Sequence, residues 1–330
     1  MAEGPNETAL ALVEGLEPGE GGAELVGEGG FTLDPTKAWT KLAHYQLADP
    51  DTFLLLFVEA AVLFECEALD IDQREGTTTI RFADLALTPD ELHGLLDAPF
   101  RGRTSGRLEG LRMLAFGLAA AGGLPGAQVD LRSEDAKGKW SVAWRPGGQL
   151  EVERVAARGQ VRRVEVAVRE PAPLRARLLG ELERAHETRR QRLAERARFA
   201  PLALRIDQVR CGSEAGHAEF DGETRALTLD RQTIGAFGRA PIHRQSRIEF
   251  VGNGVVIDTL VLPDLRAGGL ARVEAGDLAR DLSHYRLQTN ETFERRRDLA
   301  RAALESLQRT RYYARVDPTG QGPVVIEYEG

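Results

Sequence analysis

The stretch that best indicates the fold is Gly276–Arg297, GDLARDLSHYRLQTNETFERRR. Three of its residues belong to types that cap the start of a helix: Asp277, Asp281 and Ser283. Three others are spaced as apolar anchors: Leu282, Leu287 and Phe293. We therefore expect a loop that turns into a helix, and the apolar spacing beyond it extends this helix from Glu291 to Arg309.

The length and composition of the chain favour an ordinary globular protein with two domains. Its 330 residues are enough for two hydrophobic cores, since domains commonly run to about 100–200 residues. Hydrophobic residues make up 42% and charged residues 28% of the chain, which excludes a largely disordered or fibrous protein.

The net charge of −8 comes mainly from the N-terminus. Residues 1–30 are rich in Gly and Glu and contain no Lys or Arg, so we expect 1–32 to be a mobile acidic tail. The remainder is nearly neutral, and no overall field favours nucleic acid or a membrane as partner.

Cysteine usage and hydropathy indicate a cytoplasmic protein. Cys66 and Cys211 lie too far apart in sequence for a disulfide framework or a metal-ligand spacing, and the six histidines are scattered. We therefore expect no metal site. The longest apolar run, Phe53–Phe64, is too short to span a bilayer and contains Glu59, and the N-terminus lacks the basic region of a signal peptide.

The sequence of the first half of the chain predicts mainly helices, followed by a run of strands. We expect a core helix from about Pro50 to Asp70, a strand at Thr77–Phe82, a short helix that Thr88 and Pro89 begin, and a helix at Leu108–Ala121. Four strands are predicted after them: 128–132, 140–144, 149–155 and 161–168. This order favours an α+β sandwich with helices on one sheet face, because a dinucleotide-binding fold would alternate strand and helix.

The second half is predicted to contain one arginine-rich helix and a second sheet. The helix spans Leu174–Arg198, and a strand follows it as far as Ile206. From Cys211 to Gly254 the sequence is rich in strands and turns, and Val255–Leu262 is expected to be a buried strand. A short strand at Val324–Tyr328 ends the chain.

Several of these segments resemble one protein family. The pattern Leu282-Ser283-x-x-x-Leu287-Gln288-x-Asn290 resembles the catalytic loop in the middle domain of the large heat-shock chaperones of the HtpG type. The Arg198–Leu204 segment resembles the end of their ATP-binding domain, and Val256–Leu278 resembles the route into the catalytic loop. The resemblance implies a GHKL-like (Bergerat) α/β sandwich at 33–209, followed at 210–330 by a second α/β domain like the chaperone middle domain.

The resemblance implies a site for ATP and Mg²⁺, whose residues can be compared one by one. A helix of this family presents a Glu that activates water and, four residues later, an Asn that holds the metal ion. Glu59 matches the Glu, but Leu63 stands at the Asn position. The family next has an Asp that binds adenine, followed by glycines. An alignment without gaps places Phe82 there, whereas a two-residue slip places Asp84 there.

Two further family motifs are also altered. A glycine-rich phosphate loop corresponds to Gly102, Gly106 and Gly110, which alternate with arginines; the alternative is a solvated Arg/Gly loop. In the catalytic loop His284 occupies the position of the arginine that contacts the γ-phosphate, and Arg286 could replace it only outside a helix, since positions i and i+2 do not share a helix face.

The loss of the Asn, the glycines and the Arg together indicates a fold kept without its ATPase chemistry. The sequence therefore predicts a pseudo-ATPase that acts as a protein-binding or chaperone-like module without a cofactor, with Glu59, His284 and Arg286 as vestigial catalytic positions. One alternative is a chaperone-type ATPase with a divergent pocket that binds ATP with Mg²⁺. Another is a nucleic-acid adaptor that uses the arginine-rich helix at 175–198, although its glutamates offset much of the charge.

Overall fold

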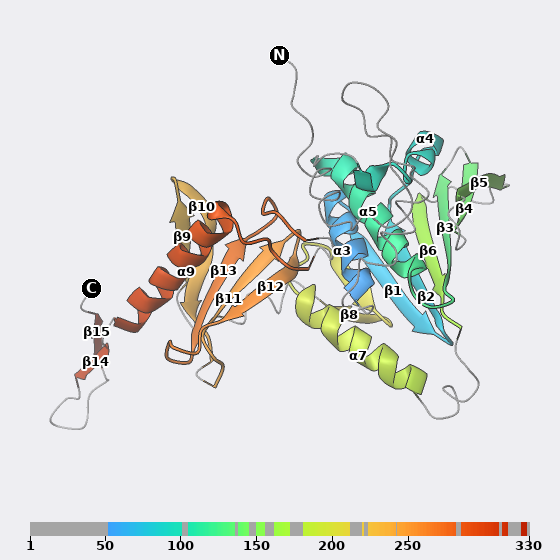
Figure 1. Cartoon of the computed structure of the whole chain (residues 1–330). Helices are drawn as coiled ribbons and strands as arrows, with labels where there is room; N and C mark the ends of the chain where they lie inside the picture. The colour runs from blue at the N-terminus through green and yellow to red at the C-terminus, as the bar shows by residue number, and fades with distance from the viewer. Residues whose placement is uncertain are drawn as a thin grey trace, which may run out of the picture. The chain divides into compact units, whose positions relative to one another are not determined.

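The computed structural model describes residues 52–100, 105–135, 138–144, 150–155, 162–171, 181–211, 220, 224–241, 243–281, 285–309, 312–315 and 325–328. The chain divides into two compact units between Gly212 and Ser213 (Figure 1). Both units combine helices with a mixed β-sheet, so the chain is an α+β protein, as predicted. None of the helices in these ranges is long and apolar enough to cross a membrane.

The first unit contains helices and an eight-stranded sheet. Its helices are α3 (Phe53–Leu63), α4 (Pro89–His93), the 3-10 helix η2 (Ala98–Phe100), α5 (Gly106–Gly122) and α7 (Glu181–Arg196). Its strands are β1 (Ala68–Arg74), β2 (Thr77–Ala83), β3 (Gln128–Asp135), β4 (Gly138–Trp144), β5 (Leu150–Val155), β6 (Arg163–Arg169), β7 (Ala203–Ile206) and β8 (Val209–Cys211). The sheet order is β5-β4-β3-β6-β2-β1-β7-β8, in which only β1 and β7 pair in parallel.

The two faces of this sheet differ in chemistry because side chains alternate along each strand. One face is apolar and lies under α3 and α5 (Figure 1). Its central residues are fully or almost fully buried: Leu69, Ile71, Ile80, Phe82, Val164, Val166 and Val168. The opposite face carries ion pairs between neighbouring strands, such as Arg81 with Asp72 and Glu165.

Helix α3 is shorter than predicted, and a strand follows it. The helix ends at Leu63, because the chain turns at Glu65, which has a φ of 57°. Residues 68–74 then form β1, where Leu69 and Ile71 enter the core and the acidic residues between them face outward. The helix prediction through Asp70 was therefore wrong. The prediction failed because the alternating pattern of β1 is short, and the stronger helical pattern of the apolar residues before it was extended across it.

Helix α4 begins as its sequence predicts. The Thr88 hydroxyl accepts a hydrogen bond from the Glu91 N–H at 3.2 Å, and the Glu91 carboxylate accepts one from the Thr88 N–H at 2.8 Å. Pro89 occupies the first turn, where no N–H is needed. This capping box fixes the connection between β2 and α4.

Helices α3 and α5 pack closely because α5 has glycines where α3 has phenylalanines. A Cβ atom on Gly110 would lie 2.9 Å from the Phe64 ring, and one on Gly117 would lie 3.0 Å from the Phe57 ring. Phe57 continues the contact to the sheet, where its ring centroid is 6.3 Å from that of Phe82. The glycines therefore let α5 approach aromatic rings that form the centre of the core.

The second unit is built on a five-stranded sheet with one long helix. Its strands are β9 (Thr224–Leu229), β10 (Gln232–Arg239), β11 (Arg247–Gly252), β12 (Val255–Val261) and β13 (Gly269–Glu274), and its helix is α9 (Glu291–Arg309). The order is β12-β11-β13-β10-β9, with only β11 and β13 parallel. A separate pair follows: β14 (Tyr312–Arg315) and β15 (Val325–Tyr328).

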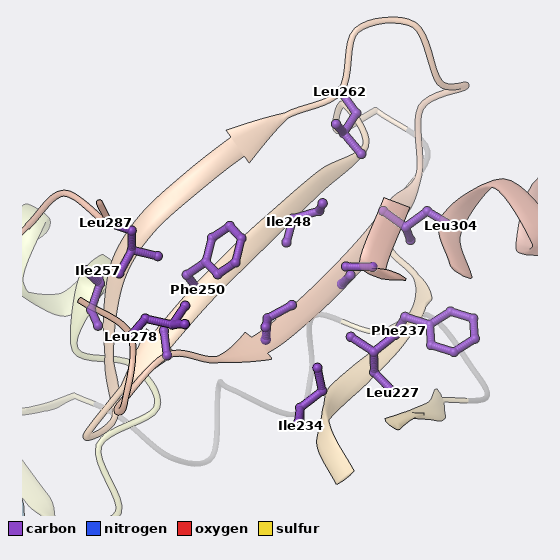
Figure 2. Packing of buried hydrophobic residues seen from close by; sticks show 14 of the residues in the cluster. Leu227, Ile234, Phe237, Ile248, Phe250, Ile257, Leu262, Leu278, Leu287 and Leu304 are labelled. Carbon is purple, nitrogen blue, oxygen red and sulfur yellow. The ribbon is translucent and has the colours of Figure 1, made fainter. Parts of the chain in front are cut away.

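The core of the second unit lies between this sheet and α9. Ile248 and Phe250 of β11 lie at its centre, and Leu304 comes from α9 (Figure 2). The Phe293 ring of α9 lies 5.1 Å from that of Phe250. The predicted helix bounds are confirmed at both ends. β12 was expected to be a buried strand, but it lies at the sheet edge, and Thr259 and Val261 are exposed.

Candidate functional site

The described residues that the sequence resemblance assigns to a nucleotide site lie on α3, in the β2–α4 connection and on α5. Asp84 follows β2 in the left-handed conformation, with a φ of 54°. Its side chain is 64% exposed and lies 3.7 Å from Arg162. Asp84 is thus a solvent-facing carboxylate at a turn, in a backbone conformation that glycine adopts most readily.

Phe82 of β2 and Glu59 of α3 are both in the core. Phe82 is fully buried and contacts Phe57, so the last inward position of β2 is apolar. Glu59 is also fully buried, on α3. A carboxylate that activates water needs access to that water, and Glu59 has none of its surface exposed.

The three glycines of the phosphate-loop prediction have different surroundings. Gly106 is the first residue of α5, has a φ of 57°, and has open space where a Cβ would be. Gly110 lies in the second turn of α5 against Phe64. Gly102 lies outside the described residues. At Gly110, the space beside the backbone is therefore filled by the Phe64 ring of the chain itself.

Arg107 joins the elements around this site. Its guanidinium donates to both carboxylate oxygens of Glu91, at 2.6 and 3.0 Å, and to the carbonyl oxygen of Ala86 at 2.7 Å. It also lies 5.5 Å from the centroid of the Phe64 ring. We call this set of contacts the Arg107 clamp. The sequence shows Arg107 near the start of a helix, but it does not show these contacts, because the residues that Arg107 contacts lie 16 to 43 positions away along the chain.

The charge of Arg107 also lowers the pKa values of its neighbours Glu91 and Cys66. Burial raises the pKa of Glu91, but the hydrogen bonds from Arg107 and Thr88 outweigh burial and hold that pKa below its usual value. Burial raises the pKa of the Cys66 thiol to about 11, although the charge of Arg107 opposes this shift. Cys66 is therefore a protonated thiol at neutral pH, and the region offers no activated nucleophile at that position.

A cavity of about 310 Å³ adjoins the clamp. Its walls come from α4 and η2 on one side and from α5 on the other: Asp90, Glu91, Gly94 and Ala98, then Leu108, Leu111 and Arg112. Ala98 and Leu111 are buried, whereas Leu108 is 54% exposed at the surface of α5. Sequence analysis missed this cavity, because it depends on how two separate helices are spaced.

The described arginines of α7 interact with other residues of the chain. Arg189 is 5% exposed, donates to Glu170 at 2.8 Å, and lies 5.4 Å from the Phe53 ring centroid. Arg190 pairs with Glu187, and Arg184, Arg192 and Arg196 also have interactions within the chain. Arg175 and Arg177 lie outside the described residues. The described part of the helix therefore gives no support to a phosphate-binding face.

The segment that resembles a catalytic loop forms part of the second unit. The N–H of Asp281 donates to the Arg286 carbonyl and that of Gln288 to the Ala279 carbonyl, both at 2.9 Å, so the segment folds back on itself. Arg286 is exposed, and His284 and Ser283 lie outside the described residues. Arg286 and the residues around Glu59 belong to different units.

The cap of α9 differs from the three predicted ones. The side-chain oxygen of Asn290 accepts from the Phe293 N–H at 2.9 Å, so Asn290 caps the helix. Asp277 instead binds Arg296 of α9 through both carboxylate oxygens, each at 2.7 Å. The prediction of Asp277 as a cap was wrong: α9 begins only at Glu291, too far along the chain for Asp277 to cap it, and the Asp277 carboxylate binds the guanidinium of Arg296, 19 residues away.

Glu274 provides a pH-dependent prediction for this segment. Glu274 is exposed at the end of β13, but the surrounding protein removes part of its solvation, and this raises its pKa above the ordinary 4.5; the nearby Asp277 carboxylate adds to that effect. The folded protein therefore holds this proton more tightly than the unfolded chain, so the contribution to stability is present below pH 4.5 and is lost as pH rises through the folded pKa. We expect Glu274→Gln to stabilise the second unit at pH 7.5 and to have little effect at pH 4, as measured by urea unfolding. An equal effect at both pH values would contradict this expectation.

The comparisons with known proteins leave the family open. No model of a known protein family matches the chain, and no curated protein matches it. Within the described part of the chain, no group of three or more His, Cys, Asp or Glu side chains is placed to hold a metal ion.

Proposed function

We propose that the chain is a GHKL-like pseudo-ATPase that acts as a protein-binding module. The observation that carries the proposal is the Arg107 clamp. Its contacts with Glu91, the Ala86 carbonyl and Phe64 tie the start of α5 to α4, to the β2–α4 connection and to the residue that follows α3, so the Arg107 guanidinium is engaged by groups of the chain itself. These are the elements where the family resemblance locates a nucleotide.

The backbone at Asp84 supports the resemblance and the loss of function together. In the alignment without gaps, Asp84 stands at the first glycine after the adenine-binding aspartate, and its φ of 54° is of the kind that favours glycine. The same alignment puts Phe82 at the aspartate position. A buried phenyl ring cannot accept a hydrogen bond from adenine, so this alignment predicts a site without its base-recognition group.

The architecture of the first unit also supports the proposal. From α3 to α5 the described elements are a helix with Glu59, two strands, the short helix α4, the 3-10 helix η2 and the helix α5; with β1 and η2 added, this is the order expected for a nucleotide pocket of the family. The helices α3 and α5 lie on the apolar face of the sheet. We propose that such a fold, once its nucleotide chemistry is lost, serves to bind a partner protein.

Thermal unfolding with and without nucleotide tests the proposal. A ligand that binds only the folded state stabilises it by mass action and so raises the midpoint temperature. At a ligand concentration one hundred times the Kd, the stabilisation is about 2.7 kcal/mol. We expect no shift with 5 mM Mg·ATP, Mg·ADP or a non-hydrolysable ATP analogue, and no heat of binding in titration calorimetry. A saturable rise with Mg·ATP would refute the pseudo-ATPase and support the ATP-binding alternative.

A further inference from the structure

The cavity between α4 and α5 has the features of a small apolar binding site. Its volume of about 310 Å³ falls within the range of ligand pockets, which begins near 300 Å³. Ala98 and Leu111 contribute buried apolar walls, and Leu108 extends the apolar surface beyond the mouth. Leu108 is one of only four large hydrophobic residues that are exposed in the described part of the chain. Its place at a cavity distinguishes it from scattered surface residues.

The charges around the cavity leave one carboxylate available. Arg112 donates to Glu109 at 2.7 Å and lies 5.1 Å from the Phe116 ring centroid. Glu91 is neutralised by the Arg107 clamp. Asp90 is exposed at the rim and, within the described ranges, has no ion-pair partner. The cavity therefore combines an apolar interior with a single uncompensated negative charge, which complements a cation.

We infer that this cavity binds an extended peptide segment of a partner protein, which inserts an aliphatic side chain between α4 and α5 and places a Lys or Arg beside Asp90. The inference rests on the proposed protein-binding function and assigns the chemistry of the partner. Leu108 lines the mouth of the cavity and is still 54% exposed, so a ligand that covers its side chain extends from the cavity across the surface of α5, as a peptide chain does.

A random dodecapeptide library displayed on phage, panned against the immobilised full-length protein, tests the inference. We expect the retained peptides to combine Leu, Ile or Met with a nearby Lys or Arg. The best of them is then labelled with fluorescein, and its Kd is measured by anisotropy. The inference would be overturned if no peptide is enriched on the protein relative to a surface without protein, or if the enriched peptides are acidic.

Two surface variants locate the binding site without disturbing the core. Leu108→Ser should weaken binding of the selected peptide at least tenfold. Asp90→Lys should weaken it by a similar factor and should restore binding of a matched peptide in which the Lys or Arg is replaced by Glu. Val209→Ser is the control, because Val209 is 55% exposed, almost as exposed as Leu108, and belongs to β8. We expect this control to bind as the parent does.

The outcomes separate this inference from the proposed function. A selected peptide whose Kd is the same for the parent, Leu108→Ser and Asp90→Lys would overturn the cavity as the site and leave protein binding in place. Stabilisation by Mg·ATP would refute the pseudo-ATPase whatever the peptides do. The two failures therefore appear in different measurements.

Discussion

Gly235→Ala is expected to unfold the second unit, at a cost of about 4 kcal/mol or more. Gly235 lies in β10 opposite Val273 of β13, next to a bulge in the pairing with β9. A Cβ at this position would lie 1.9 Å from the Arg272 carbonyl oxygen and 3.2 Å from the Val273 Cα. Both are backbone atoms of the neighbouring strand, so the clash can be relieved only by opening the sheet. The expected cost exceeds that of an ordinary substitution for this reason.

The positions of the tryptophans allow this effect to be assigned to one unit. All three tryptophans, Trp39, Trp140 and Trp144, precede Gly212, so tryptophan fluorescence reports on the first unit alone. Gly235→Ala should leave that transition unchanged and should abolish the hydrogen-exchange protection of β10, β13 and α9. Gly276→Ala is the control, because a Cβ there would meet only the movable Glu274 carboxylate, at 3.0 Å. Retained protection in Gly235→Ala would contradict the expectation.

Asp277→Ala is expected to destabilise the second unit by about 2–3 kcal/mol. The Arg296 side chain is only 10% exposed, and Asp277 is the carboxylate that it binds through two hydrogen bonds. Removal of the carboxylate leaves a mostly buried cation whose remaining hydrogen-bond acceptor, among the described residues, is the Glu274 carbonyl oxygen. Loss of one partner of a buried pair costs about 3–5 kcal/mol, and the smaller value allows for the 63% exposure of Asp277.

A double-mutant cycle measures how much of this cost belongs to the pair. Arg296→Met removes the cation, so Asp277→Ala should cost much less in that background, with a coupling of about 1–3 kcal/mol by urea unfolding followed by circular dichroism. Asp298→Ala is the matched control, because Asp298 pairs with its neighbour Arg297 at the surface and should cost less than about 1 kcal/mol. Additive effects of Asp277→Ala and Arg296→Met would show that the two side chains do not stabilise each other.

The sequence predicted elements better than the contacts between them. The periodicity of α9 and the capping box of α4 are local signals, and both are found where they were expected. The cap of α9 was missed although its signal is also local: Asn290 directly precedes Glu291, the first residue of the helix, whereas Asp277 lies too far upstream to cap it. What no local pattern shows is that the Asp277 carboxylate binds Arg296.

The candidate site shows the same division. The sequence identified Gly110 and Glu59 by type and spacing, but the environment of each depends on how α3 and α5 pack. The sequence alone does not distinguish a glycine that lets a nucleotide approach the backbone from a glycine that lets a phenyl ring approach it. The left-handed backbone conformation of Asp84 was likewise not evident from its residue type, because it depends on the turn that follows β2.

The Arg107 clamp has a consequence for the timing of partner release. An ATPase module changes its affinity for a partner at each turnover, so the time that a partner stays bound depends on a chemical step. A module of the proposed kind has its own arginine, held by Glu91 and the Ala86 carbonyl, where that step would occur. Its partner would leave with a single dissociation rate constant, and occupancy would follow the partner's concentration whatever the ATP level.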